Sequence, residues 1–250
     1  KLMILITRPL AQATNLKSLI NNLGIKTALF PTFEINKIKA EIPKQKFDVI
    51  IFISANAVDY AEQYFNNIIV KPISIFTIGP ITAKKLIEKD IKVDGYPKNN
   101  SSSKVLLNMP YFKDLKDSEI LIVRGKGGSE YLKNTLQVKN NVNYFEVYER
   151  VPCDLTRLHS QSIKEFLKVD DGVIVINSLE SLSLMIELVN KESKIFLDQF
   201  KIREMIVLSE RIKEQAKILG FKKITVTLNP SDQDVVDLLG SKNNKKITRI

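Results

Sequence analysis

Small and polar residues follow one expected strand after another along this chain. Ser54-Ala55-Asn56 comes directly after the apolar run 48–53, and Arg124-Gly125-Lys126 follows the run 119–123. Each turn opens an expected helix, whose first backbone N–H groups are free and whose positive dipole end favours carboxylates or phosphates. The pattern therefore predicts an anion-binding site built from several turns. The candidate binding residues are Arg8, Ser54, Ala55, Asn56, Gly79, Thr82, Arg124, Gly125, Lys126, Ser178, Ser209 and Arg211.

Each candidate also has an ordinary structural explanation. Ser54, Ser178 and Thr82 are residue types that cap helix N-termini. Arg8 is equally suited to a surface ion pair. The run Gly125-Lys126-Gly127-Gly128 resembles a phosphate loop but lacks the closing Gly-Lys-Ser or Gly-Lys-Thr, and such a run alone is more often a tight turn.

The rare reactive residues exclude several classes of site. One cysteine, Cys153, rules out an intramolecular disulfide framework, and one histidine, His159, argues against a histidine metal cluster. His159 lies in a helical context away from the turns, so no nucleophile stands beside a general base. We therefore expect no metal and no cofactor. No apolar run reaches the ~20 residues of a membrane span, and the N-terminal one is too short for a signal peptide, so we expect no membrane association and a cytoplasmic protein.

The charge favours an anionic ligand without pointing to nucleic acid. The 250 residues are 44% hydrophobic and 26% charged, with 38 basic and 28 acidic side chains and a net charge of +10. Basic proteins often bind polyanions, but here the cations are spread over the whole chain and tryptophan is missing. We therefore expect a small anionic ligand and no nucleic acid. We expect the final helix to end near residue 239 and the basic tail 241–250 to fray.

Short β-branched runs alternate with helical patterns throughout, which predicts parallel sheets covered by helices. The number of strands is too large for one sheet of flavodoxin size, so we predict two α/β domains. The expected strands span 3–7, 26–30, 48–53, 74–78, 91–94, 119–123, 143–149, 172–176, 205–208 and 224–227.

Charged, proline-containing segments at about 33–46 and 149–155 mark two crossings between these domains. The first domain is then discontinuous, with residues 1–34 and 152–250, and the second comprises residues 39–147, with linkers at about 35–38 and 148–151. Ligands of such folds bind beyond the carboxyl ends of the strands. Two domains facing each other leave a cleft there, and we expect the site in that cleft.

Several motifs occur in an order shared with a known family. They are Ile6-Thr7-Arg8-Pro9 with Gln12-Ala13 and Gly24, Pro31, Phe52-Ile53-Ser54-Ala55-Asn56-Ala57-Val58, Ile78-Gly79-Pro80-Ile81-Thr82-Ala83, Val147-Tyr148-Glu149-Arg150, Asn177-Ser178, 211–221 and Pro230-Ser231. On these residues the chain resembles the uroporphyrinogen-III synthase family over nearly its whole length. It departs from the family at Ile53-Ser54, where Thr-Ser is common, and at Ser209-Glu210-Arg211, where some members have a Gly-Pro-Thr-Thr turn.

The resemblance implies two flavodoxin-like α/β domains joined by a two-stranded linker, with the active site in the interdomain cleft. It implies a cofactor-free lyase of tetrapyrrole and heme biosynthesis that cyclises hydroxymethylbilane to uroporphyrinogen III with inversion of ring D. It also implies a catalytic tyrosine in the linker strand, which here is Tyr148. The turn residues would hold the eight carboxylates of the substrate, and we expect a monomer.

The implied reaction depends on substrate folding and one proton transfer. Loss of the ring A hydroxyl gives an azafulvene, which the substituted carbon of ring D attacks to form a spiro intermediate. That intermediate fragments and recloses, whereas spontaneous closure gives isomer I. The enzyme therefore acts mainly by proximity and orientation. Tyr148 is the candidate donor to the leaving hydroxyl, because a phenol of ordinary pKa, about 10, stays protonated at neutral pH. Its ordinary structural explanation is packing at a strand end.

Three other functions fit parts of the pattern. A non-catalytic two-domain protein that closes on a small anionic ligand would share the fold, so only turnover separates it from the enzyme. A nucleic-acid-binding protein would need a clustered basic and aromatic face. A two-domain glycosyltransferase would usually be longer than 250 residues.

Overall fold

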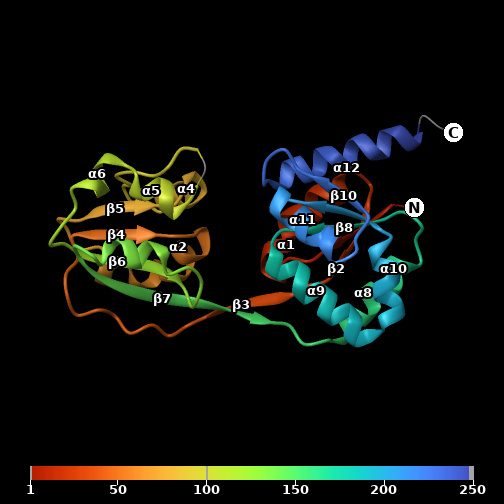
Figure 1. Cartoon of the computed structure of the whole chain (residues 1–250), viewed down its shortest axis with the longest axis horizontal. Coiled ribbons are helices and arrows are strands. Elements are labelled where there is room, and N and C mark those ends of the chain that lie inside the picture. The colour runs from red at the N-terminus through yellow and green to blue at the C-terminus, as the bar shows by residue number, and fades with distance from the viewer. Residues whose placement is uncertain (1, 100, 248–250) are drawn as a thin grey trace. The chain divides into compact units, whose positions relative to one another are not determined.

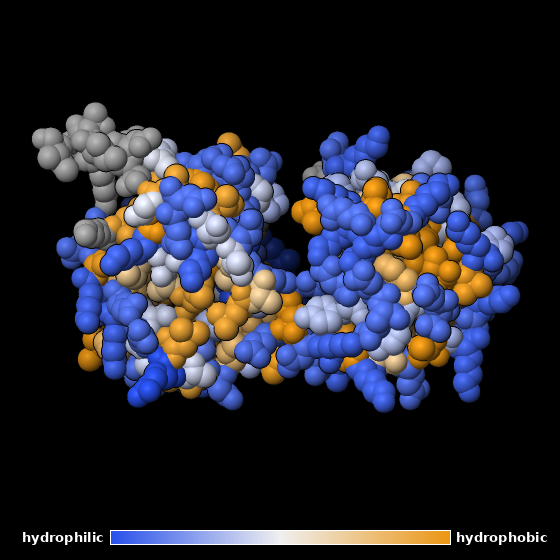
Figure 2. All heavy atoms as spheres, turned by 180° about the vertical axis from the view of Figure 1, so that it is seen from behind, coloured by the Kyte–Doolittle hydropathy of each residue, from blue (hydrophilic) through white to orange (hydrophobic). Residues whose placement is uncertain are grey.

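The chain divides into two compact units, each with its own sheet. A computed structural model describes residues 2–99 and 101–247 (Figure 1). The first unit combines Lys1–Glu34 with Val151–Ile250, and the second is Ile35–Arg150. On the face drawn in Figure 2, hydrophilic side chains cover most of both units. No described helix is both long enough and apolar enough to cross a membrane.

The first unit holds a five-stranded sheet in the order β10-β9-β8-β1-β2. Every neighbouring pair is parallel. The central strands are buried on both faces, which explains their uninterrupted apolar sequences. The bounds are β1 (Met3–Ile6), β2 (Lys26–Leu29), β8 (Gly172–Ile176), β9 (Glu204–Val207) and β10 (Lys223–Val226).

Helices cover both faces of this first sheet. One face packs against α1 (Leu10–Asn22) and α12 (Asp232–Ile247), and the other against four helices. When the five strands are numbered 1 to 5 along the sequence, they lie across the sheet as 2-1-3-4-5, which is the flavodoxin-like arrangement. The four helices are α8 (Arg157–Leu167), α9 (Leu179–Glu192), α10 (Lys194–Lys201) and α11 (Glu210–Ile218).

The second unit also has a five-stranded sheet between two layers of helices, with the strand order β3-β7-β6-β4-β5. Apolar side chains of one face pack against α2, α3 and α4, and those of the other against α5, α6 and α7. The strands are β3 (Phe33–Lys37), β4 (Val49–Phe52), β5 (Ser74–Thr77), β6 (Glu119–Gly125) and β7 (Asn141–Pro152). The helices are α2 (Ala55–Ala61), the 3-10 turn η1 (Glu62–Tyr64), α3 (Phe65–Ile68), α4 (Pro80–Ile87), α5 (Ser103–Leu107), α6 (Pro110–Lys113) and α7 (Tyr131–Leu136).

The chain passes from one unit to the other inside two strands. The unit boundaries fall after Glu34, within β3, and after Arg150, within β7 (orange and green in Figure 1). These two strands are hydrogen-bonded neighbours in the second sheet. The fold class expected from the sequence, two parallel α/β sheets with two strands at the crossings, is therefore confirmed.

His159 has a structural role next to the first crossing. The Thr156 backbone N–H donates to His159 Nδ1 at 3.1 Å, so Nε2 carries the proton and donates to the carbonyl of Pro31 at 2.7 Å. The imidazole is buried and packs edge-on against Phe30. It fixes the start of α8 against the end of the segment that leads into β3.

One strand and the end of one helix expected from the sequence are wrong, and helices α6 and α10 were missed. The segment 91–94 is not a strand, and the nearest pairing is a single bridge between Phe76 and Gly95. The Asp94 carboxylate accepts from the Ile75 N–H at 2.8 Å, which replaces regular ladder pairing there. The last helix continues through the expected frayed tail to Ile247, and residues 248–250 lie outside the described part. Helix α10 was not anticipated, although Ser193 caps it.

Candidate active site

Tyr148 and Ser54 meet at the carboxyl edge of the second sheet. The Tyr148 hydroxyl lies 3.1 Å from Ser54 Oγ, and Ser54 Oγ also accepts from the Ala57 N–H at 3.0 Å as the N-cap of α2. The Tyr148 side chain is only 5% exposed and its ring packs against that of Tyr60, with centroids 5.6 Å apart. Two of the predicted site residues, about 90 positions apart in sequence, are thus in direct contact.

A β-bulge turns Tyr148 toward Ser54. Regular alternation would place Phe145 and Val147 on one face of β7 and Tyr148 on the other. The register pairs Arg124 with Glu146 but Gly125 with Tyr148, so Val147 is an extra residue. As a result Phe145, Val147 and Tyr148 all pack in the cluster that contains α2.

Gly125 provides the space for the Tyr148 ring. A Cβ at Gly125 would lie 2.4 Å from the ring carbon Cε2 and 2.5 Å from Cζ. The next residue, Lys126, donates its backbone N–H to the Tyr148 carbonyl at 2.7 Å. The predicted glycine turn therefore packs directly on the predicted catalytic residue. The Lys126 side chain itself is exposed, with its Nζ 3.8 Å from the Glu149 carboxylate.

The Arg124 side chain is engaged by neighbouring protein groups. Its side chain is buried, and its Nε donates to the Gly125 carbonyl at 3.0 Å. Nη1 donates to Glu130 Oε1 at 3.1 Å, and the guanidinium carbon lies 4.3 Å from the ring centre of Tyr144. The guanidinium thereby joins the start of the glycine turn to Glu130 beyond its end. Burial and these protein partners engage the side chain, and its role as a substrate ligand stays a prediction.

The partners of Arg124 have shifted pKa values. Burial, and then the hydrogen bond to Glu130 at 2.8 Å, raise the pKa of Tyr144 to about 12. The same hydrogen bond, with the charge of Arg124, holds the pKa of Glu130 below its ordinary value against partial desolvation. The cluster keeps the phenol protonated and the carboxylate ionised around neutral pH.

Gly79 and Thr82 lie at the start of α4, next to β5. Gly79 is the N-cap, and a Cβ there would meet Ser101 Oγ at 2.1 Å. Its carbonyl accepts from Thr77 Oγ1 at 2.9 Å. Thr82 is buried within the helix and is not a cap, contrary to its structural interpretation from sequence. Ala55 and Asn56, the first residues of α2, are both half-buried.

The first unit presents a second set of predicted residues at the carboxyl edge of its own sheet. Ser178 caps α9 by accepting from the Ser181 N–H at 3.1 Å, and Ser209 caps α11 by accepting from the Ile212 N–H at 3.4 Å. Arg211, in α11, is exposed. Arg8 forms an ion pair with Asp232 at 2.5 Å. The cap interpretation is thus confirmed for Ser178, and Ser209, for which none was given, also caps its helix.

Asn177 and Thr227 lie at this same edge and were not among the sequence candidates. Each follows a strand directly, Asn177 after β8 and Thr227 after β10. Position after a strand was the signal used for the other candidates, so it could have identified both.

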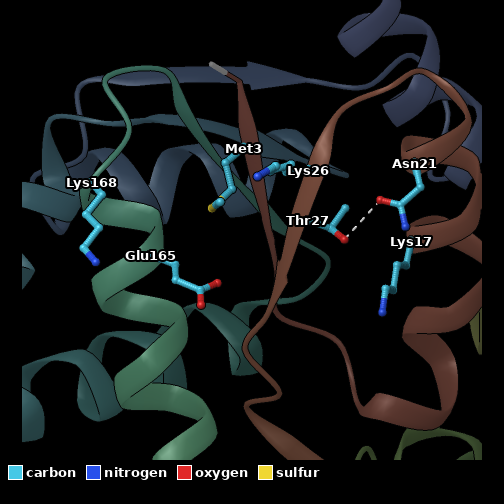
Figure 3. A pocket seen from close by; sticks show the side chains of 7 residues that line it. All are labelled: Met3, Lys17, Asn21, Lys26, Thr27, Glu165 and Lys168. Carbon is cyan, nitrogen blue, oxygen red and sulfur yellow. Dashed lines mark hydrogen bonds between the residues drawn. The ribbon is translucent and has the colours of Figure 1, made fainter.

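A hollow of about 540 Å³ lies at the opposite, amino edge of the first sheet. Figure 3 shows Lys17 and Asn21 of α1 on one side of β2, and Glu165 of α8 with Lys168, the residue after α8, on the other. Thr27 Oγ1 donates to Asn21 Oδ1 at 3.3 Å. Ligands of parallel α/β sheets bind at the carboxyl edge, so this hollow is not our candidate site. Across residues 2–99 and 101–247, no group of His, Cys, Asp and Glu side chains is arranged to hold a metal ion.

Comparison with known families identifies the chain. The family model described as "Uroporphyrinogen-III synthase HemD" matches residues 14–237. The chain belongs to the uroporphyrinogen-III synthase family. The family predicted from the sequence is therefore confirmed, and with it the enzyme class, a lyase of porphyrin and heme biosynthesis.

Relatives of this family match along nearly the whole chain. The uroporphyrinogen-III synthase of Escherichia coli is 26% identical over 246 residues, covering 93% of this chain and 97% of its own length. The uroporphyrinogen-III synthase of Salmonella typhimurium is 27% identical over 247 residues, with the same coverage of 93% and 97%.

Solved structures of the family share the fold. A uroporphyrinogen-III synthetase from Helicobacter pylori aligns with a TM-score of 0.65 and 17% identity, over 96% of this chain and 99% of its own. A mutant uroporphyrinogen III synthase from Thermus thermophilus aligns with a TM-score of 0.61 and 15% identity, over 98% and 99%. Within the family fold, the contact between Ser54 and Tyr148 joins a polar turn to a tyrosine of the crossing strand β7.

Proposed function

We propose that this uroporphyrinogen-III synthase cyclises hydroxymethylbilane with Tyr148 as the proton donor to the leaving hydroxyl. The observation that carries the assignment is the 3.1 Å contact between the Tyr148 hydroxyl and Ser54 Oγ at the carboxyl edge of β4. Ligands of this fold class bind at that edge. The family membership supports the reaction, and the contact supports the role of the residue.

The hydrogen bond between Tyr148 and Ser54 uses only one of their two hydroxyl protons. Two hydroxyl groups carry two protons, and one of them lies in the bond between the oxygens. Ser54 Oγ also accepts from the Ala57 N–H, so the second proton is not needed there. When Ser54 donates to Tyr148, the phenol O–H is left to point at the substrate. The pair is thus arranged as a hydrogen-bond donor.

The proton balance of the reaction fits a single donor. The C–O bond to the ring A hydroxyl breaks as Tyr148 supplies the proton, and water leaves. The substituted carbon of ring D then attacks the azafulvene to form the spiro intermediate, which fragments and recloses. The proton lost when aromaticity is restored returns the phenol to its starting state, so the net change is elimination of water. In this scheme the reaction needs no proton donor other than Tyr148.

The substrate carboxylates are bound by turns of both units in this proposal. Helices α4, α9 and α11 begin at the carboxyl edges of their sheets, where backbone N–H groups favour anions. The exposed cations Lys126 and Arg211 add charge. The ligand residues proposed are Arg8, Ala55, Asn56, Gly79, Thr82, Gly125, Lys126, Ser178, Ser209 and Arg211.

A coupled assay with freshly generated hydroxymethylbilane tests the reaction. Uroporphyrin isomers are resolved after oxidation and compared with a control without enzyme. An excess of isomer III is the expected result. Isomer I alone from folded protein would overturn the proposal, and the non-catalytic binding protein would then be the better explanation.

Tyr148→Phe tests the residue. We expect kcat to fall about 100-fold, the lower end for general acid catalysis, at an unchanged isomer ratio. Tyr131→Phe, at an exposed tyrosine of the same unit, is the control and should keep wild-type turnover. Wild-type turnover in Tyr148→Phe would refute the donor role. Slow turnover to isomer I would show instead that Tyr148 folds the substrate.

The proposal includes a monomeric enzyme in the cytoplasm that binds no nucleic acid. The single cysteine, Cys153, supports a reducing compartment, because no intramolecular disulfide is possible. Sedimentation of the purified chain tests the monomer, and a mass near twice 28.5 kDa would contradict it.

A further inference from the structure

Four buried polar atoms of the first unit have no hydrogen-bond partner within the described residues; one, Arg203 Nε, precedes β9 at the amino edge, and the other three lie at the carboxyl edge. The three at the carboxyl edge are Arg8 Nε, Asn177 Oδ1 and Thr227 Oγ1. Buried polar groups are nearly always paired, and an unpaired one destabilises the fold. All three belong to residues that follow strands, namely β1, β8 and β10. We call them the orphan row.

The strand register places the orphan row at one level of the sheet. Ile6 pairs with Val175, which brings Arg8 beside Asn177 when the register continues by two residues. Ile176 and Val226 both pair with Val207 of the strand between them, so Asn177 and Thr227 are also level. The Thr227 N–H donates to the Val207 carbonyl at 3.0 Å, so the register does continue beyond β10.

Alternation along the strands puts the three side chains on one face. Ile6 and Val175 pack in the cluster with α1 and α12, and residues two positions further along a strand point the same way. Arg8 Nη1 is held by Asp232, the first residue of α12, and Asp232 also accepts from Asn15 of α1 at 2.8 Å. The outer nitrogen of Arg8 is therefore engaged while its Nε is not.

A ligand that satisfies the orphan row must both donate and accept hydrogen bonds. Arg8 Nε is a donor and suits a carboxylate, whereas Asn177 Oδ1 is an acceptor and cannot pair with an ionised carboxylate. Given the proposed function, the only ring donors on the substrate are its pyrrole N–H groups. We infer that the orphan row binds one pyrrole ring, with Asn177 Oδ1 accepting the ring N–H and Arg8 Nε donating to a carboxylate of that ring.

Thr227 completes the row as a hydroxyl that donates or accepts. Its side chain is 94% buried, its exposure being 6%, so its hydroxyl must find a partner inside the protein or in a ligand. Thr227 lies two strands, about 10 Å, from Asn177, so a carboxylate substituent of a ring bound at Asn177 would supply that partner. In this inference the bound substrate supplies hydrogen-bond partners that the described residues do not supply.

The test measures both stability and binding. If the orphan row is a ligand site, removing its polar atoms should raise the melting temperature, whereas if these atoms have a structural role, their removal should lower it. Thr227→Val and Asn177→Leu each remove an unpaired polar atom, so we expect the melting temperature to rise by about 2–4 °C. We expect KM for hydroxymethylbilane to rise about 3–10-fold with a smaller change in kcat. Thr32→Val is the matched control, because that buried hydroxyl has partners at 3.1 and 3.3 Å and its loss should lower the melting temperature.

A non-catalytic probe separates failure of this inference from failure of the proposed function. Porphobilinogen is a single pyrrole with an N–H and two carboxylates, and its binding is followed by NMR at millimolar concentration. We expect Asn177→Leu to weaken this binding and to leave unchanged the weaker binding of the N-methyl analogue. Equal porphobilinogen binding by wild type and variant refutes the row as a pyrrole site, even if the wild type makes isomer III. A lower melting temperature in both variants also refutes it, since the row would then hold a structural water.

Discussion

The ring of Tyr148 occupies the space in which Gly125 would carry a side chain. A Cβ there would lie 2.4 Å from the Tyr148 ring, well inside van der Waals contact, and the adjacent Lys126 N–H is bonded to the Tyr148 carbonyl. The glycine turn that begins at Gly125, the last residue of β6, therefore packs directly against the tyrosine. Its sequence resembles a phosphate loop, but its first glycine is required by packing.

Gly125→Ala should displace Tyr148 and lower activity. We expect a loss of about 1–3 kcal/mol in the free energy of unfolding, typical of overpacking, and a fall in kcat. Chemical denaturation and the isomer assay measure the two effects.

The control for Gly125→Ala lies two residues away. Gly127 has a φ of +77° and nothing within 4 Å of its Cβ position, so Gly127→Ala strains the backbone without touching Tyr148. It should lose about 1 kcal/mol and keep kcat. In a Tyr148→Ala background, Gly125→Ala should cost no further activity. A further loss there would show that the glycine acts other than through the ring.

Ser54→Ala should combine a capping loss with a catalytic loss. Ser54 caps α2 and contacts the Tyr148 hydroxyl, so its removal leaves one helix N–H and the phenol without this partner. We expect a loss of about 1 kcal/mol in unfolding free energy and a fall of about 10-fold in kcat.

Ser102→Ala isolates the capping part of that effect. Ser102 caps α5 in the same unit and in the same way, accepting from the Val105 N–H at 3.2 Å, and its backbone conformation matches that of Ser54. It should lose similar stability at unchanged kcat. If both variants lose activity equally, Ser54 has no role beyond the helix.

Strand sequences predicted the fold class because burial shows directly in composition. The run Val49–Phe52 is apolar at every position, as a strand covered on both faces must be. The run 91–94 has alternating apolar residues, yet the Asp94 carboxylate binds the N–H of Ile75 and stops the ladder. A side chain competing for a backbone group of another strand leaves no trace in the local pattern.

The site was predictable as a set of turns but not as a geometry. Ser54 and Tyr148 were named separately, whereas their contact depends on the bulge at Val147, which is a property of the register between two strands. Arg124 was named as a ligand because it follows a strand, but its burial depends on Glu130 and Tyr144, which lie on other elements. Position along the chain indicates an edge, and packing decides which side chains face it.

Tyr144 should make the protein sensitive to high pH. Its pKa in the folded protein is raised to about 12 by burial and the bond to Glu130, above the ordinary value of 10.0. Between these values the folded state binds more protons than the unfolded state, so stability is complete below about pH 10 and falls as pH rises toward 12. Absorbance at 295 nm should show one tyrosine titrating late.

Tyr144→Phe should remove this part of the alkaline loss. It should also reduce the loss on the acid side, where the lowered pKa of Glu130 makes stability fall as pH drops below its ordinary value, 4.5. Melting temperatures from pH 3 to pH 11 measure the losses of stability on the acid and on the alkaline side, and Tyr131→Phe, at an exposed tyrosine, is the control. Identical pH profiles for wild type and Tyr144→Phe would exclude the proposed linkage.

Arg124 and Lys126 should respond to substitution in opposite ways, although they are separated by one residue. The Arg124 guanidinium is buried among protein partners, so Arg124→Met should lower the free energy of unfolding by about 2–4 kcal/mol. Its folded fraction should keep the wild-type KM. Lys126 is exposed, so Lys126→Ala should leave stability nearly unchanged and raise KM for the anionic substrate by about 2–5-fold, an effect that added salt diminishes. Denaturation curves and KM at two salt concentrations separate the cases. A raised KM in Arg124→Met at full folding would restore Arg124 to the substrate ligands and would mean that its side chain leaves Glu130 on binding.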